Sequence, residues 1–182
     1  MSIWDQWKTT RCECPPVGHV LRMAFPARWL RIHNLPQSKR YPETAAEEQE
    51  VLHRNNVVAS ALLGAGTECL AIVTEWEPLQ RFASWHLAET PPPWSLDDDL
   101  REELATASFR WRTLRWRPGD FDSEILARAR DKVGSLIVFS PPTGNVYCPY
   151  DGGADLILAE PADAKAFQRL FAAWRSSLPS GL

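Results

Sequence analysis

Residues 135–159, SLIVFSPPTGNVYCPYDGGADLILA, decide the fold of this chain. The apolar, β-branched run 135–140 predicts a buried strand. The turn-forming residues 141–145 lead into a second arm at 146–148, and 155–159 predicts a third strand. Because parallel neighbours need long crossover connections, three strands joined by such short turns favour an antiparallel or mixed sheet.

A long helix is predicted over residues 45–63, ahead of these strands. Thr44 and Glu47 have the spacing of a capping box, and Gly64 and Gly66 mark the end of the helix. Apolar residues recur at helical spacing in between, namely Val51, Leu52, Val58, Ala59, Leu62 and Leu63. This pattern requires a core on one side of the helix.

The rest of the chain supplies further short elements. We expect strands at 29–32, 69–74, 81–87 and 108–117, with 81–87 as the partner of 69–74, and an extended loop at 90–94. We expect helices at 97–104 and 121–133, and a last helix that begins at Pro161 and has Ala166, Phe167, Leu170, Phe171 and Trp174 on its apolar face.

The expected architecture is an α+β fold, with helices packed mainly on one face of an antiparallel or mixed sheet. The prolines of Cys14-Pro-Pro-Val-Gly18 would break any regular element, so residues 1–27 are expected to be irregular. Residues 28–182 are expected to form a single α+β domain, a size that can bury a substantial core.

Composition points to a cytoplasmic protein. The 182 residues are 45% apolar, yet no apolar run approaches the roughly 18–20 residues that span a bilayer, so no membrane partner is predicted. The N-terminus lacks the order of a secretory signal. Four cysteines fit reduced thiols better than a disulfide framework. Nine tryptophans each bring one N–H that needs a partner at the core edge or at an interface.

The net charge of −3 hides a strong pattern. Residues 43–106 carry thirteen acidic side chains against three basic ones, whereas residues 1–42 carry two against seven. The acidic block would suit a basic partner, and a solvated helix face explains it as well.

Arginine and tryptophan alternate in residues 109–117, at Arg110, Arg112, Arg115 and Arg117 with Trp111 and Trp116. Proteins that bind single-stranded nucleic acid combine such residues to pair phosphates and stack bases. An edge strand with solvated arginines over indole rings is the alternative. The overall acidity makes a nucleic-acid partner the weaker expectation.

A second anion site is possible near His33, where Lys39 and Arg40 supply charge-assisted donors. No glycine-rich phosphate loop accompanies them, and Arg31, Lys39 and Arg40 would equally pair with the acidic helix that follows. Asp151-Gly-Gly-Ala-Asp155 predicts a tight turn with left-handed glycines rather than a metal site. No metal or cofactor is predicted, and no catalytic motif is present, which favours a protein that is not an enzyme.

Three stretches resemble the signature of a bacterial family of unknown function. The opening stretch is WLRIHNLPQSKRYP at residues 29–42, and the closing stretches are YCPYDGGAD at 147–155 and WRSSLPSGL at 174–182. The resemblance covers residues 28–182 and implies no catalytic residue. Proteins of this type resemble immunity proteins that are encoded beside secreted toxins.

Our leading hypothesis is therefore an immunity protein that occludes the active site of a cognate toxin. Acidic helix faces would meet a basic cleft, with tryptophan as an anchor, and the residues expected to bind are Glu47, Glu48, Trp94, Asp97, Asp98 and Asp99. The alternative is a nucleic-acid or nucleotide-binding protein, with or without enzymatic activity, that uses strand 109–117 and His33, Lys39, Arg40, Arg110, Arg112 and Arg115. An interaction module without a toxin partner is a third hypothesis.

Overall fold

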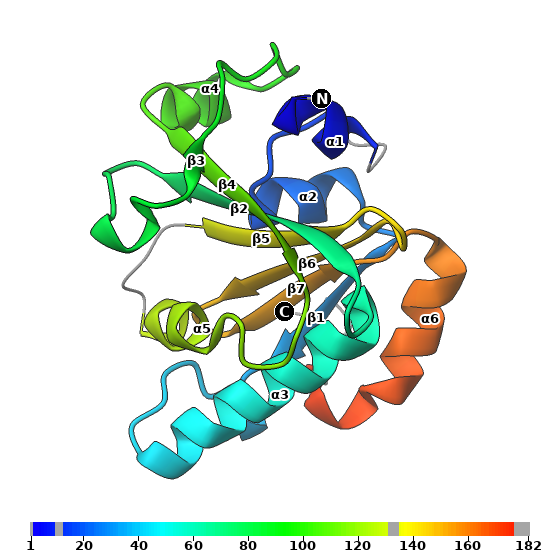
Figure 1. Cartoon of the computed structure of the whole chain (residues 1–182). Coiled ribbons are helices and arrows are strands. Elements are labelled where there is room, and N and C mark those ends of the chain that lie inside the picture. The colour runs from blue at the N-terminus through cyan, green and yellow to red at the C-terminus, as the bar shows by residue number, and fades with distance from the viewer. Residues whose placement is uncertain (1, 10–12, 131–134, 177–182) are drawn as a thin grey trace.

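One antiparallel sheet organises the molecule. The computed structural model describes residues 2–9, 13–130 and 135–176. Within these residues seven strands lie in the order β1-β7-β6-β5-β2-β4-β3 (Figure 1). They are β1 (Trp29–His33), β2 (Glu68–Glu75), β3 (His86–Leu87), β4 (Ser108–Arg115), β5 (Ser135–Ser140), β6 (Asn145–Tyr150) and β7 (Gly153–Ile157). Every neighbouring pair is antiparallel, which confirms the α+β class.

The C-terminal strands form the meander that the short turns predict. β5 pairs with β6, and β6 pairs with β7. The first strand of the chain, β1, then adds to the outer edge of β7 with Trp29 opposite Ile157. This long-range pairing brings the N-terminal and C-terminal parts of the chain together.

The three longest helices cover one face of the sheet, as expected. They are α3 (Ala45–Leu63), α5 (Asp122–Ala129) and α6 (Pro161–Leu170), and their buried residues share one core with the sheet. On the opposite face α1 (Ile3–Lys8) and α2 (Gly18–Ala24) cover a second core. α4 (Asp98–Leu104) packs on α2, because Leu100 joins Val17 and Val20 in a third, small cluster.

The expectation that residues 1–27 are irregular is wrong. Ser2 and Asp5 form a capping box that starts α1, and Trp4 and Trp7 lie on the same side of that helix and are buried. The prolines at 15 and 16 only separate α1 from α2. α1 and α2 have six and seven residues, fewer than two turns each, so no hydrophobic period marks them, although the Ser2–Asp5 spacing is a local sign of where α1 begins.

The expectation of a strand at 81–87 that pairs with residues 69–74 is also wrong. The neighbours of β2 are β4 and β5, and only the two residues of β3 form a strand, which pairs with β4. Residues Gln80–Phe82 form a 3₁₀ turn instead. Phe82 and Trp85 are drawn into the core, where their rings meet edge to face at 5.1 Å, and this packing overrides strand geometry.

Helix α3 confirms its prediction at both ends. Thr44 and Glu47 make the capping box, and Gly64 has a φ of 84° just beyond the last turn. The last helix begins at Pro161 as expected, but Leu170 is exposed and Ala164 is buried, so its apolar face is rotated from the expected one. Residues 131–133 of the expected helix 121–133 lie outside the described residues.

Composition led to two expectations, that no segment spans a membrane and that the cysteines are reduced. None of the helices in the described part of the chain combines the length and hydrophobicity that crossing a bilayer requires. Cys69 and Cys148 are free, buried thiols, and burial raises the pKa of Cys69 to about 11. Cys14 is disulfide-bonded, so the expectation of four reduced thiols is wrong for this residue.

Candidate functional site

The opening and closing stretches that carry the family resemblance lie against each other in the fold. Arg31 of β1 donates from Nε to Asp155 Oδ1 of β7 at 3.0 Å, and the Nε of Arg40 lies 2.5 Å from Asp151 Oδ2. The hydroxyl of Tyr41 also donates to Asp151, at 3.2 Å. Cations from the opening stretch therefore hold two aspartates whose side chains are only 6% and 11% exposed, Asp155 and Asp151.

A buried polar chain continues this junction into the core. Tyr147 donates its hydroxyl to Asn55 Oδ1 at 2.6 Å, and Asn55 donates to Asn34 Oδ1 at 2.7 Å. Asn34 in turn donates to the backbone carbonyl of Asp151 at 3.3 Å. Because buried polar groups are costly unless they are paired, this chain fixes β1, α3 and the β6–β7 turn in one arrangement.

The turn at Asp151 and Gly152 confirms the predicted tight turn, although the reason differs. Among the described glycines, those with positive φ are Gly64, Gly66, Gly119 and Gly144, so neither glycine of this turn is left-handed. A Cβ on Gly153 would lie 2.0 Å from the carbonyl oxygen of Ile32. Glycine is required here because the backbone of β1 approaches so closely. Within the described residues no three His, Cys, Asp or Glu side chains gather as metal ligands would.

Backbone strain and a buried histidine mark the end of β1. Gln37 and Ser38 have φ values of 57° and 58°, a left-handed conformation that is unusual outside glycine. His33 is 8% exposed, and its Nε2 has no hydrogen-bond partner among the described residues. Both features border a cavity of about 140 Å³ that Arg54 and Trp174 also line.

We expect His33 to make stability fall when the pH drops below about 6.5. Burial, followed by the charges of Arg31 and Arg54, lowers the pKa of His33, so the unfolded chain takes up this proton at a higher pH than the folded protein. The stabilisation is complete above the unfolded pKa and is lost as the pH falls toward the folded one. Urea unfolding at pH 7.5 and pH 5.5 should show a smaller loss for His33→Gln than for wild type.

The exposed His86 provides the control for this prediction. His86→Gln removes one histidine from a solvated site on β3, so its loss of stability over the same pH range should match wild type. An equal loss in His33→Gln and wild type would contradict the assignment of the pH dependence to His33.

The residues of the alternative anion site do not come together. Five strand spacings separate β1 from β4, a distance of about 24 Å at ~4.8 Å per strand. His33, Lys39 and Arg40 thus lie far across the sheet from the β4 arginines. Lys39 pairs with Glu43 and Glu47 at 2.8 and 2.7 Å. Of the three basic residues expected to pair with the acidic helix, Lys39 does so, whereas Arg31 and Arg40 pair with Asp155 and Asp151 of the closing stretch.

The arginines of β4 make intramolecular contacts. Arg110 Nε lies 2.8 Å from Glu75 Oε2. The guanidinium of Arg112 lies over the ring of Trp85 at 4.6 Å. Arg115 donates to the carbonyl of Gly66 at 3.4 Å. The contact of Arg112 with Trp85 matches the expected arginine over an indole ring, but the expected edge strand with solvated arginines is wrong, because β4 lies between β2 and β3 and both Arg110 and Arg112 are half-buried.

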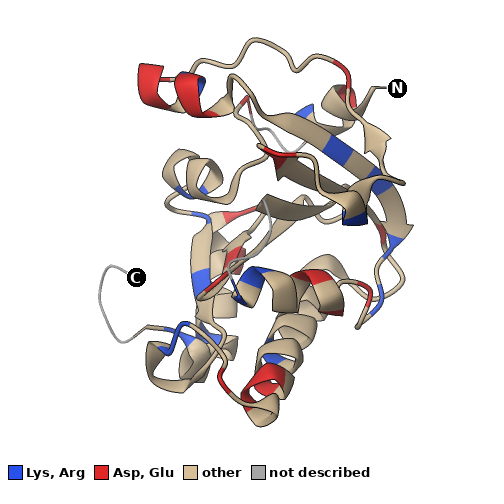
Figure 2. Cartoon of the chain, turned by 90° about the vertical axis from the view of Figure 1, so that its left-hand side faces the viewer, with Lys and Arg blue, Asp and Glu red and all other residues tan. Residues whose placement is uncertain are grey.

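The six residues expected to bind a partner fall into two groups at opposite ends of the molecule. Figure 2 shows acidic residues gathered on α4 at one end and on the first turns of α3 at the other. At the α3 end Glu47 completes the capping box, and Glu48 forms an ion pair with Arg130. One contact surface therefore does not include both groups.

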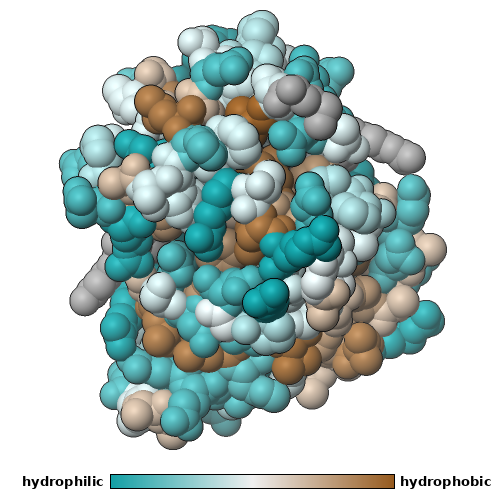
Figure 3. Space-filling view, viewed as in Figure 1, coloured by the Kyte–Doolittle hydropathy of each residue, from teal (hydrophilic) through white to brown (hydrophobic). Residues whose placement is uncertain are grey.

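The second group forms what we call the α4 surface, made of Trp94, Asp97, Asp98, Asp99 and Glu102 with the adjoining hollow. Trp94 is half-buried and meets Trp4 edge to face at 5.4 Å. Beside it lies a cavity of about 360 Å³ lined mainly by Trp4, Trp7, Pro92, Pro93 and Trp94. Figure 3 shows hydrophobic side chains that reach the surface over α4 and between α4 and α1. Apolar area and carboxylates are thus adjacent here.

The fold and these features define a single-sheet α+β protein with an acidic, tryptophan-lined surface and a buried ionic junction between its two signature stretches. The chain belongs to the family described as Domain of unknown function (DUF3885), which matches residues 17–179. The match begins one residue before α2, so it takes in α2 and every described strand but not α1. No curated protein and no solved structure matches the chain.

Proposed function

We propose that this protein works by binding a protein partner, as an immunity protein whose α4 surface covers the active site of a cognate toxin. The observation that supports the proposal is the row of exposed carboxylates on α4 beside a tryptophan-lined hollow. Interfaces of this kind place aromatic anchors at the centre and charges around them. A toxin that acts on an anionic substrate such as nucleic acid would offer a basic cleft of complementary charge.

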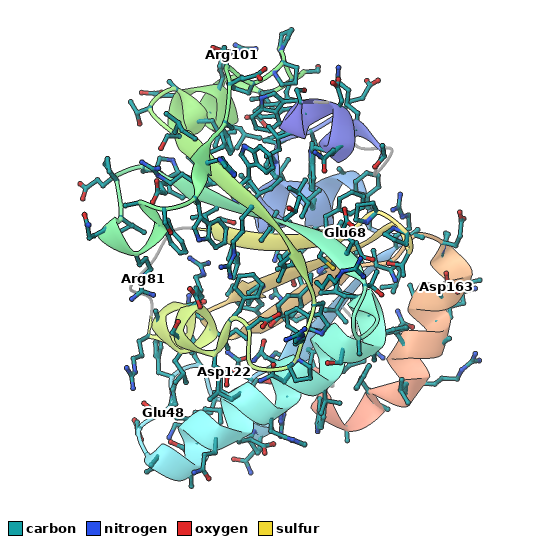
Figure 4. All side chains as sticks on the ribbon, viewed as in Figure 1. Glu48, Glu68, Arg81, Arg101, Asp122 and Asp163 are labelled. Atoms are coloured by element: carbon teal, nitrogen blue, oxygen red, sulfur yellow. The ribbon has the colours of Figure 1, made fainter. Side chains whose placement is uncertain are left out.

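The charge of α4 is available to such a partner. Residues 97–104 contain five carboxylates against the single cation Arg101. Asp97 caps the helix and Asp98 pairs with Arg101 at 2.5 Å, whereas Asp99 and Glu102 are exposed. Figure 4 shows Arg101 at the upper end of the molecule and Glu48 at the lower end, so the proposal uses α4 alone as the partner site.

Charge reversal on α4 is expected to weaken toxin binding. The double variant Asp99→Lys/Glu102→Lys leaves the helix cap intact and should raise the Kd for the toxin by about 100-fold, mainly through slower association. Surface plasmon resonance with the purified toxin at low and high salt would measure this, because the difference should shrink as salt screens the charges. Protection of the toxin's substrate should fall in parallel.

The matched control reverses two acids far from α4. Glu68→Lys/Asp163→Lys changes the net charge by the same amount on β2 and α6 (Figure 4) and should leave the affinity within about twofold of wild type. Equal affinities for the α4 variant and the control would refute the α4 surface as the partner site. A full chain that binds no protein and protects against no toxin would refute the function itself.

The nucleic-acid alternative has less support. Arg110 and Arg112 are the central cations of strand 109–117, and both contact side chains of the same molecule. Binding of single-stranded RNA or DNA at low salt, with an affinity that falls steeply as salt rises, would favour this alternative over the immunity function.

A further inference from the structure

A second cavity, which we call the arginine pocket, opens beside the junction of the two signature stretches. It has a volume of about 430 Å³, within the range of small-molecule sites. Its charged lining brings together four arginines from four parts of the chain, namely Arg22, Arg31, Arg40 and Arg128. Arg22 lies on α2, Arg31 on β1 and Arg128 on α5, and Arg40 lies in the segment that precedes α3.

The two buried carboxylates of the junction hold two of these arginines in fixed positions. Asp155 accepts from Nε and Nη2 of Arg31 at 3.0 and 3.4 Å, and this two-point contact fixes the plane of the guanidinium. Asp151 holds Arg40 through its Nε. Cations held in this way are already ordered, so a ligand does not have to order them at a further entropic cost.

One carboxylate of the pocket is shared by two cations. Asp155 accepts both hydrogen bonds from Arg31, and Nη1 of Arg22 lies 3.9 Å from the same Asp155 oxygen that Arg31 Nη2 engages. Arg22 therefore brings a positive charge that Asp155, already paired with Arg31, only partly compensates. An anion is therefore the ligand whose charge fits the pocket.

One neutral donor and two aromatic rings complete the lining. The hydroxyl of Tyr150 makes no hydrogen bond to another residue in the described ranges, and burial raises the pKa of Tyr150, so the group remains a donor at neutral pH. The rings of Tyr150 and Trp76 provide apolar walls. Such a lining suits an organic molecule with an anionic end better than it suits a bare ion.

We propose that the arginine pocket binds a small organic anion that carries a phosphate or carboxylate group. Guanidinium forks match both groups in geometry. The pocket adjoins α4, because Glu103 of that helix lines it, but Arg22 and Tyr150 lie outside the α4 surface and test the pocket separately.

Isothermal titration calorimetry on the full chain tests this proposal, with inorganic pyrophosphate and citrate as separate probes at constant ionic strength. Wild type should bind at least one probe with a Kd below about 1 mM. Arg22→Gln should raise that Kd about tenfold or more, as the loss of a charge-assisted hydrogen bond predicts. Preference for pyrophosphate would identify a phosphate ligand, and preference for citrate a carboxylate ligand.

Two further variants keep the result interpretable. Arg169→Gln removes an exposed cation from α6 and should bind the probes as wild type does. Tyr150→Phe removes only the hydroxyl and should weaken binding of the probes several-fold. This variant therefore tests the pocket if Arg22→Gln does not fold. Absence of saturable binding by wild type up to about 10 mM would overturn the proposal, and so would equal binding by the Arg22 and Arg169 variants.

Discussion

Replacing Gly153 with alanine is expected to lower the free energy of unfolding by about 3 kcal/mol. The new methyl carbon would lie 2.0 Å from the carbonyl oxygen of Ile32 and 3.1 Å from the hydroxyl of Tyr150. The obstacle at Ile32 is backbone, so no change of rotamer relieves it. β1 and β7 would have to separate where His33 lies opposite Gly153, next to the ionic junction that holds Arg31 on Asp155.

Alanine variants at two other glycines provide the comparison for this prediction, with the free energy of unfolding of the full chain measured in urea. A Cβ on Gly152 would meet the side-chain ring of Tyr150 at 3.0 Å and no backbone atom, so Gly152→Ala should cost less, about 1 kcal/mol. A Cβ on Gly18 would make an ordinary 3.5 Å contact at the start of α2, and Gly18→Ala should change stability by no more than about 0.5 kcal/mol. A Gly153→Ala protein as stable as Gly18→Ala would contradict the close approach of the two strands.

Replacing Arg110 with methionine is expected to destabilise the protein by about 3 kcal/mol. The side chain of Glu75 has no exposed area, and its Oε2 lies 2.8 Å from Arg110 Nε while its Oε1 accepts from the backbone N–H of Leu79 at 3.0 Å. Loss of the guanidinium leaves a buried carboxylate without its counter-charge. That desolvation cost, more than the loss of the attraction itself, gives the expected magnitude.

The double variant Glu75→Gln/Arg110→Met separates these two contributions. A neutral amide still accepts from Leu79 and buries no charge, so stability should return to within about 1 kcal/mol of wild type. Arg117→Met, at an exposed arginine of the same segment, should stay within about 0.5 kcal/mol. If Arg110→Met were as stable as Arg117→Met, Arg110 would be free to serve a ligand, and the nucleic-acid alternative would gain support.

Local patterns account for the parts of the fold that were predicted from sequence. The bounds of α3 follow from the Thr44–Glu47 capping box and from Gly64, which are interactions within one short segment. The meander β5-β6-β7 follows from alternating apolar runs and short turns, which restrict the pairing to neighbours in the chain. The α+β class rests on these features.

Elements with a weak local signal were missed. α1 has a capping box but is too short to show a helical period, and the α2 sequence lacks a side-chain cap. Both helices pack on the apolar side chains of the second face of the sheet and remove them from water. That apolar face forms only when all the strands have paired, so no single segment predicts the helices. The segment at 81–87 has strand-like residues, yet Phe82 and Trp85 gain more by packing into the core than a strand would gain by pairing.

The candidate sites likewise contain features that the sequence predicts and features that depend on the tertiary structure. The sequence by itself determined that an acidic helix follows Trp94, because charge and capping residues are local to residues 94–104. Only the tertiary structure decided that the first turn of α3, which carries Glu47 and Glu48, lies at the other end of the molecule from α4, and that Arg31 meets Asp155 across 124 residues of chain. The arginine pocket likewise depends on the addition of β1 to β7, since strand pairing over such separations is set by the burial of the whole sheet and not by any one segment.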